Sequence, residues 1–304
     1  MYMADNIFSE LLWIFPVYSF LGWCLEVVFN SVNTGEFVNR GFLNGAVCPI
    51  YGIGAGVMIG ALMSFEDNLL YLFLGAFVIG SLLELVGGFL MKKLFHMSWW
   101  DYSDQPMNIG GYICLKFSLA WGIAGIMLMR VIHPLVAEVV GLVPDLLLHF
   151  ILIGFYISFI VDAVITVIAV LKLGRDLKEV TRLSKMLHKS SDAIAKSVGN
   201  TAIHVSERVR EMELGEKARE VSERMHTASE DNRRRVHDKL EALQRLNALL
   251  DSGGAVRSRL FKAFPRMNNI SHSSALEEMR KRIESIGRQK HGEKKAERSR
   301  DQES

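Results

Sequence analysis

Five long apolar stretches within the first 171 residues limit the possible folds of this 304-residue chain more than any other feature. Each is close to the roughly 20 residues that an α-helix needs to cross a hydrocarbon core about 30 Å thick. A soluble protein that buried five such helices would keep too little polar surface. We therefore predict an all-α, polytopic membrane domain. The predicted spans are residues 11–29, 47–65, 69–91, 113–132 and 146–171.

Charge divides the chain near Lys172. The part before this residue carries 5 basic and 12 acidic side chains, whereas the remainder carries 30 basic and 21 acidic ones. The overall net charge of +2 therefore describes neither part, and the shift predicts a domain boundary. We predict a transmembrane domain over residues 1–172, a charged helical region over 173–252, and a basic amphipathic segment followed by a disordered tail over 253–304.

Basic residues between the spans predict the orientation in the membrane. Arg40 follows the first span, Lys92 and Lys93 follow the third, and the tail opens with Lys172. Lys and Arg accumulate in cytoplasmic loops. We therefore expect the N-terminus outside the cell and the C-terminal tail in the cytoplasm.

Three carboxylates lie inside predicted spans, at Glu26, Glu84 and Asp162. Even on the most lenient scale, a charge facing lipid costs roughly 2.5–3.5 kcal/mol. Each acid shares a helix face with small or polar residues four positions away, so each should face another helix. Either the three converge on one site toward the cytoplasm, with Arg40 or Lys116 as a cation, or each is held separately by a local donor.

The segment 37–52 is too apolar for a solvated loop and too rich in Gly, Asn and Pro for a regular helix. Irregular backbone at membrane depth survives only against protein or a water-filled cavity. We predict a re-entrant or cavity-lining loop, with an interfacial loop as the alternative. The candidate substrate- or ion-binding residues are Glu26, Glu84, Asp162, Arg40, Asn39, Asn44, Asn108 and Asp101, and no catalytic or metal-binding residue is predicted.

A short pattern occurs twice in the membrane part. Gly-x-x-x-Glu within one span precedes Gly-x-x-Cys at the start of the next, ending at Cys48 in the first copy and Cys114 in the second. This order indicates two parallel two-helix units plus a fifth helix, unless the short matches arise by chance. Both cysteines are predicted to be buried small hydrophobic residues rather than metal ligands.

The tail alternates charged and apolar residues at steps of three and four between residues 173 and 250. This period predicts coiled-coil-like helices, formed either by a helix that folds back on another or by an oligomer. Residues 257–266 are basic and apolar and suit an anionic membrane surface or a partner protein. Acidic residues are interleaved with the basic ones in the tail, so we do not expect the tail to bind nucleic acid.

The chain lacks a Gly-x-x-x-x-Gly-Lys-Ser/Thr loop, so we expect neither ATP binding by that route nor a cofactor.

Three segments resemble the putative ABC-transporter type IV family, the CmpB-like bacterial membrane permeases. They are Phe-Leu-Gly-Trp-Cys-Leu-Glu at 20–26, Asn-Arg-Gly-Phe-Leu-Asn-Gly-Ala-Val-Cys-Pro-Ile-Tyr-Gly at 39–52, and Trp-Asp-Tyr-Ser-Asp-Gln-Pro-Met-Asn at 100–108. The resemblance covers roughly residues 10–170. It implies a permease of unknown substrate in a bacterial inner membrane, and an ABC role would require a separate ATPase subunit.

Three functions follow as hypotheses. The first is a transport subunit whose buried carboxylates form a polar site and whose tail docks a partner or forms a homo-oligomer. The alternative is a membrane-anchored interaction protein that acts through the tail. A lipid-directed enzyme that uses two carboxylates ranks last, because no nucleophile or metal set accompanies them.

Overall fold

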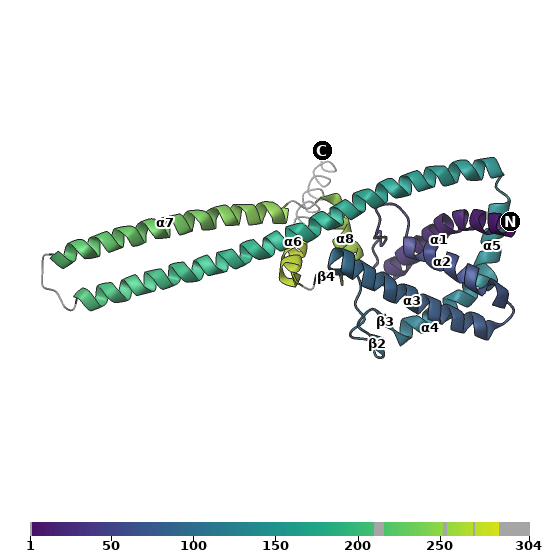
Figure 1. Cartoon of the computed structure of the whole chain (residues 1–304), viewed down its shortest axis with the longest axis horizontal. Helices are drawn as coiled ribbons and strands as arrows, with labels where there is room; N and C mark the ends of the chain where they lie inside the picture. Colours follow the sequence, from purple (N-terminus) through teal and green to yellow (C-terminus); the bar gives the residue numbers. More distant parts are fainter. Residues whose placement is uncertain (1, 210–215, 252–253, 270, 286–304) are drawn as a thin grey trace, which may run out of the picture. The chain divides into compact units, whose positions relative to one another are not determined.

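The computed structural model describes residues 2–209, 216–251, 254–269 and 271–285, and these are almost entirely helical (Figure 1). The chain forms two compact units, which are described separately. The first contains Met1–Gly174 together with Gly254–Ser271, and the second contains Arg175–Gly253 together with His272–Ser304. Residues 254–271, which the sequence groups with the basic C-terminal segment, thus belong to the membrane unit.

The elements of the first unit follow in chain order. They are α1 (Tyr2–Thr34), α2 (Pro49–Leu62), a 3-10 turn (Met63–Phe65), α3 (Leu69–Phe95), β1 (Met97–Ser98), β2 (Asn108–Ile109), β3 (Ile113–Cys114), α4 (Leu115–Met127), a π-helical turn (Leu128–Ile132), α5 (His133–Gly141), the start of α6 (Asp145–Val209), α8 (Ala255–Ala263) and β4 (Asn268–Asn269). Strand β1 pairs antiparallel with β4, and β2 pairs antiparallel with β3.

Four helices are long and apolar enough to cross a membrane: Glu10–Thr34, Leu69–Phe95, Leu115–Gly141 and Asp145–Lys189. The remaining apolar stretch forms a shorter helix over Pro49–Phe65. Its α-helical part, α2, has 14 residues and is therefore about 21 Å long. Pro49 starts this helix, so residues 47 and 48 belong to the preceding loop. The structure confirms a helical membrane domain, whereas the count of five spans stays a prediction.

Helix α3 shows how these helices face lipid on one side and protein on the other. Its buried positions recur every four residues: Leu72, Ala76, Gly80, Glu84 and Gly88. Large apolar side chains on its other faces, such as Val78, Leu82 and Val86, are about half exposed. Small residues on the buried stripe let a neighbouring helix approach closely. The predicted placement of Glu84 on a protein-facing stripe is therefore confirmed.

The first fold-back loop, residues 35–48, returns along the helix that precedes it. The backbone N–H of Cys48 donates to the carbonyl of Ser19 at 2.9 Å, although α1 continues to Thr34. The fifteen positions from Ser19 to Thr34 correspond to about 22 Å of helix. Helix α2 therefore begins beside the middle of α1 and runs antiparallel to it. The loop is irregular up to Cys48, as predicted, and lies against the last turns of a membrane helix. The prediction of irregular backbone up to residue 52 is wrong for residues 49–52, which form the first turn of α2 because Pro49 is accepted at a helix start.

The second fold-back loop, residues 96–114, repeats this construction on α3. Helix α4 begins at Leu115 and runs back along α3, where the hydroxyls of Ser81 and Ser118 hydrogen-bond at 2.7 Å. Both loops thus follow a long helix that carries a glutamate, and both lead into a helix that packs antiparallel on it. This correspondence supports the two-unit repeat predicted from the sequence.

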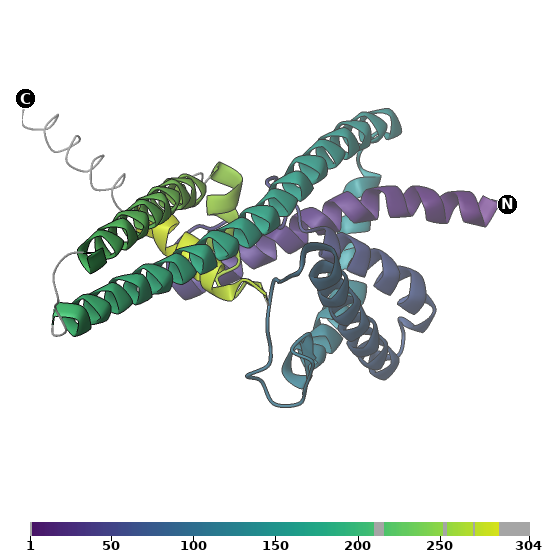
Figure 2. The ribbon, with the colours of Figure 1, turned by 60° about the vertical axis from the view of Figure 1, so that its left-hand side comes forward.

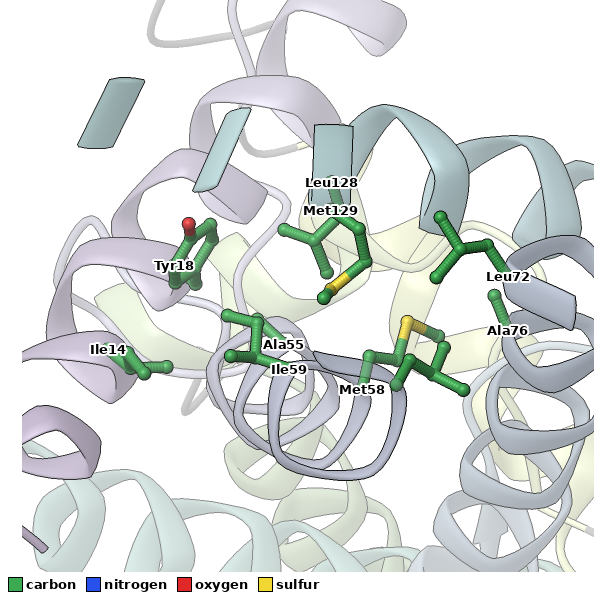
Figure 3. Close-up of a cluster of buried hydrophobic side chains, with 10 residues drawn as sticks. Ile14, Tyr18, Ala55, Met58, Ile59, Leu72, Ala76, Leu128 and Met129 are labelled. Atoms are coloured by element: carbon green, nitrogen blue, oxygen red, sulfur yellow. The ribbon is translucent and has the colours of Figure 1, made fainter. Parts of the chain in front are cut away.

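The apolar core lies around α2, which packs against α1, α3 and the π-helical turn (Figure 3). Tyr18 of α1, Met58 of α2, Leu72 of α3 and Met129 of the π-helical turn all belong to one buried cluster. Helix α2 thus contributes to the core through its contacts with α1 and α3.

The second unit contains the distal part of α6 and α7 (Glu216–Asp251), which run side by side (Figures 1 and 2). Lys239 Nζ of α7 donates to Ser191 Oγ of α6 at 2.6 Å. Helices that fold back on each other were one of the two predicted arrangements, while oligomerisation stays a prediction. The predicted disordered end lies among residues 286–304, which are outside the described residues. Met212, one of the regularly spaced apolar residues of the tail, is outside them as well.

We expect Gly80→Ala to destabilise the membrane unit, because the added methyl group would meet the Trp121 side chain at 2.6 Å. Overpacking of this kind costs roughly 1–3 kcal/mol. Gly60→Ala is the control, since nothing lies within 4 Å of a Cβ at that position. Thermal unfolding of the detergent-purified protein, followed by tryptophan fluorescence, measures the effect. Equal melting temperatures for the two variants would show that α3 and α4 do not pack as described.

Candidate functional site

Glu26 sits where the first fold-back loop passes α1. Its carboxylate accepts a hydrogen bond from the Tyr51 hydroxyl at 2.7 Å and lies 3.7 Å from Nε of Arg40. The Tyr51 ring packs directly on Gly22, one turn earlier, where any side chain would collide with it. Arg40 also donates to Oδ1 of Asn30 at 3.3 Å. The first glutamate is thus paired with a cation and a phenol.

Glu84 has a different set of partners. Its carboxylate accepts from the Tyr102 hydroxyl at 2.8 Å and from Nε1 of Trp121 at 3.4 Å. Only 8% of the residue is exposed, and within the described part of the chain no salt bridge to it is found. A buried carboxylate with neutral donors alone is costly to ionise.

An aromatic contact joins the two glutamates. The ring of Tyr51, which binds Glu26, lies 5.9 Å from the ring of Trp121, which binds Glu84. Burial raises the pKa of Tyr102, and the charges of Glu84 and, more weakly, Glu26 raise it further, so both acids act on one phenol. We call this set the glutamate cluster. Its members are Glu26, Arg40, Tyr51, Glu84, Tyr102 and Trp121.

Asp101 and Asn108, both predicted site residues, shape the second fold-back loop instead of joining the glutamate cluster. Oδ1 of Asp101 accepts from the N–H and hydroxyl of Ser103, and these bonds lower the pKa of the carboxyl. The side chain of Asn108 donates to the Ser103 carbonyl at 3.2 Å and accepts from the Gly111 N–H at 3.2 Å. The Gly111 carbonyl in turn accepts from the N–H of Tyr102. Together they hold Tyr102 over Glu84.

Asp162 is satisfied separately. Its carboxylate accepts from the backbone N–H of Asn44 at 3.1 Å, the Asn44 amide at 2.8 Å, the N–H of Gly45 at 2.7 Å and the hydroxyl of Thr166 at 3.2 Å. Local donors therefore hold this acid, which is the second of the two arrangements considered for the three carboxylates. Asp162 does not share the partners of Glu26 and Glu84.

The first fold-back loop nevertheless links the acids. Asn39 accepts from Nε1 of Trp23 at 2.8 Å and donates to the carbonyl of Asn44 at 2.8 Å, which fixes the loop between them. Arg40 then reaches Glu26 on one side, and Asn44 reaches Asp162 on the other. Five of the eight candidate residues are thus connected through this loop, while Glu84 joins through Tyr51 and Trp121.

Arg259 is the most distant residue that the sequence analysis missed. From α8 its Nη1 donates to the Gly41 carbonyl at 2.6 Å, its Nη2 to the Phe42 carbonyl at 2.8 Å, and its Nε to Oδ1 of Asn44 at 3.2 Å. Burial lowers the pKa of Arg259, and the neighbouring Asp162 opposes that shift. More than 200 residues separate it from the loop, so no spacing pattern indicates the contact.

The segment around Arg259 packs on the membrane unit, although the sequence predicted a membrane-surface or partner-binding segment. Leu260 and Phe261 of α8 are buried, and the Phe264 ring meets the Trp99 ring edge-on at 4.9 Å. Trp99 is itself 4% exposed and is therefore enclosed by protein. The segment thus touches both fold-back loops.

The described residues offer no group of three or more His, Cys, Asp or Glu side chains that could hold a metal ion. Cys48 and Cys114 are buried free thiols, as the repeat suggested.

Comparison with known proteins identifies the family. The putative ABC-transporter type IV family matches residues 13–167. No curated protein and no solved structure matches the chain. The matched range contains both fold-back loops and the whole glutamate cluster, and with four apolar helices it indicates a transport-related membrane protein. The chain belongs to the putative ABC-transporter type IV family.

Proposed function

We propose that this protein is the membrane-spanning subunit of an ABC-type transporter and that the glutamate cluster is its polar intramembrane site. The contact of Tyr51 with Trp121, which places Glu26 and Glu84 in one cluster, is the observation that carries this proposal. A cluster of two carboxylates and one arginine retains an acidic group that must be protonated or must meet a cation. Membrane helices rarely keep such a group without a function.

The fold-back loops are the parts that would open and close access to this site. The first carries Arg40 to Glu26, and the second carries Tyr102 to Glu84. Each contributes a polar partner without being a regular helix, so each can move without breaking a helical hydrogen-bond ladder. In this proposal the loops lie at membrane depth on the cytoplasmic side, with the N-terminus outside and the tail in the cytoplasm of a bacterial cell.

The second unit supplies a surface for a separate ATPase subunit or a second copy of the chain. Helix α7 exposes Val236, Leu240 and Leu243, which recur at helical spacing.

An interaction protein that acts only through its tail is the alternative. Replacing residues 187–243, which include Val236, Leu240 and Leu243, by a short Gly/Ser linker keeps α8 and separates the two hypotheses: full activity of that variant rejects the alternative.

Neutralising either glutamate should abolish or strongly reduce transport. We expect Glu26→Gln and Glu84→Gln to lower solute flux by at least about tenfold, because the charged partner of the solute or proton is lost. Reconstituted vesicles, tested with a panel of radiolabelled solutes, provide the measurement. Glu138→Gln is the matched control, because Glu138 is exposed on α5. Unchanged flux of every transported solute in folded Gln variants would contradict the proposal.

Tyr102→Phe tests the support that the second fold-back loop gives to Glu84. The change removes one of two donors to a buried carboxylate while leaving the ring to stack on Phe117 at 4.6 Å. We expect the free energy of unfolding to fall by roughly 1–3 kcal/mol. Tyr71→Phe, at an exposed tyrosine, should have little effect. Equal stability of both variants, measured by thermal unfolding in detergent, would show that Tyr102 does not support Glu84.

A further inference from the structure

All three nitrogen atoms of the Arg259 guanidinium are hydrogen-bonded to the first fold-back loop. The acceptors are two backbone carbonyls, of Gly41 and Phe42, and the side-chain oxygen of Asn44. Guanidinium groups present donors in one plane and in a fixed fork, so three converging oxygens form a complementary receptor. An ammonium group has no such plane and fits this set less well.

One oxygen of this receptor, that of the Asn44 side chain, is oriented by residues other than Arg259. The amide nitrogen of Asn44 donates to Asp162 at 2.8 Å and to Thr166 at 3.0 Å, which directs the amide oxygen toward the guanidinium. The Asn44 carbonyl is held by Asn39. Asp162 adds a negative charge behind the amide. The Asn44 side-chain oxygen should therefore keep its position when the arginine leaves, whereas the Gly41 and Phe42 carbonyls lose this donor.

We propose that the oxygens of Gly41, Phe42 and Asn44, backed by Asp162, form a binding site for guanidinium-bearing solutes, and that Arg259 occupies it as a tethered competitor. This goes beyond the proposed function, because the site is distinct from the glutamate cluster and its occupancy can be measured without transport. Release of Arg259 would free the first fold-back loop and expose the site.

Cys48 supplies a natural reporter at the end of the same loop. It is 6% exposed and follows Asn44 by four positions in the chain. Its backbone is tied to Ser19, at the point where the loop meets α1. A loop that loses its guanidinium partner should therefore expose the Cys48 thiol more often.

The experiment measures the rate at which a maleimide labels Cys48 in the full chain purified in detergent, with Cys24 and Cys114 changed to Ala. We expect Arg259→Ala to raise this rate by about tenfold, as expected for loss of charge-assisted hydrogen bonds. Low-millimolar guanidinium chloride should return the rate toward that of the parent. Urea, a neutral molecule of the same shape, and sodium chloride at equal concentration should not.

Further variants keep the outcome interpretable. Lys262→Ala, at an exposed basic residue of the same helix, should label like the parent. Arg259→Lys keeps charge and stem but lacks the fork, so it should label at an intermediate rate. Adding Asp162→Asn to Arg259→Ala should weaken the guanidinium effect several-fold.

Two results would overturn the proposal. One is equal labelling of Arg259→Ala and Lys262→Ala, which would show that Arg259 does not hold the loop. The other is a guanidinium effect no larger than that of urea in a folded Arg259→Ala protein, which would show that the oxygens do not recognise the ion. Neither result bears on the glutamate cluster, and absence of solute flux in vesicles would leave the guanidinium measurement intact.

Discussion

The cost of placing carboxylates inside an apolar helix bundle governs this structure. Glu26 is met by a tyrosine hydroxyl and the Arg40 guanidinium, Glu84 by a tyrosine hydroxyl and an indole N–H, and Asp162 by four donors. Hydrocarbon provides none of these groups, so the chain must bring them from elsewhere. It does so with two loops that turn back along the helices carrying the glutamates, and with α2 and α4, the helices that follow these loops. The helix packing, the short α2 and the irregular loop backbone follow from that requirement.

The fold-back loops also explain how a polar site can remain adjustable. A regular helix could present donors only at fixed positions, whereas residues 35–48 reach Glu26 through Arg40, Asp162 through Asn44 and α8 through the Gly41 carbonyl. One segment therefore connects two acids and the C-terminal part of the membrane unit. A change at any of these contacts would be felt at the others, because they share one short backbone.

Much of this arrangement could be predicted from the sequence. Hydropathy identified the membrane helices, i to i+4 spacing placed Glu84 on the buried face of α3, and Gly, Asn and Pro content indicated an irregular loop at residues 37–52. The repeated Gly and Cys positions matched two loops of similar construction. These signals are local, and local patterns are what a sequence displays directly.

The remaining features depend on contacts between distant residues. Tyr51 and Trp121 join the glutamates because each ring packs on a glycine of another helix, and no local pattern indicates such a pairing. Nothing in the sequence indicated that Arg259 contacts the first fold-back loop. Of the three acids considered together, Glu26 and Glu84 are linked through the contact of Tyr51 with Trp121, whereas four nearby donors hold Asp162. Asp101 and Asn108 have polar side chains in the right loop, yet their hydrogen bonds shape that loop.

The central claim is that Glu26 and Glu84 form one site, and a double-mutant cycle tests it most directly. The free energies of unfolding of Glu26→Gln, Glu84→Gln and the double variant are measured in one detergent, with the Glu84 and Asp162 pair as reference. We predict a coupling energy of roughly 0.5–3 kcal/mol for the two glutamates and near-additivity for the reference pair. Additive effects of the two glutamate changes would contradict the account.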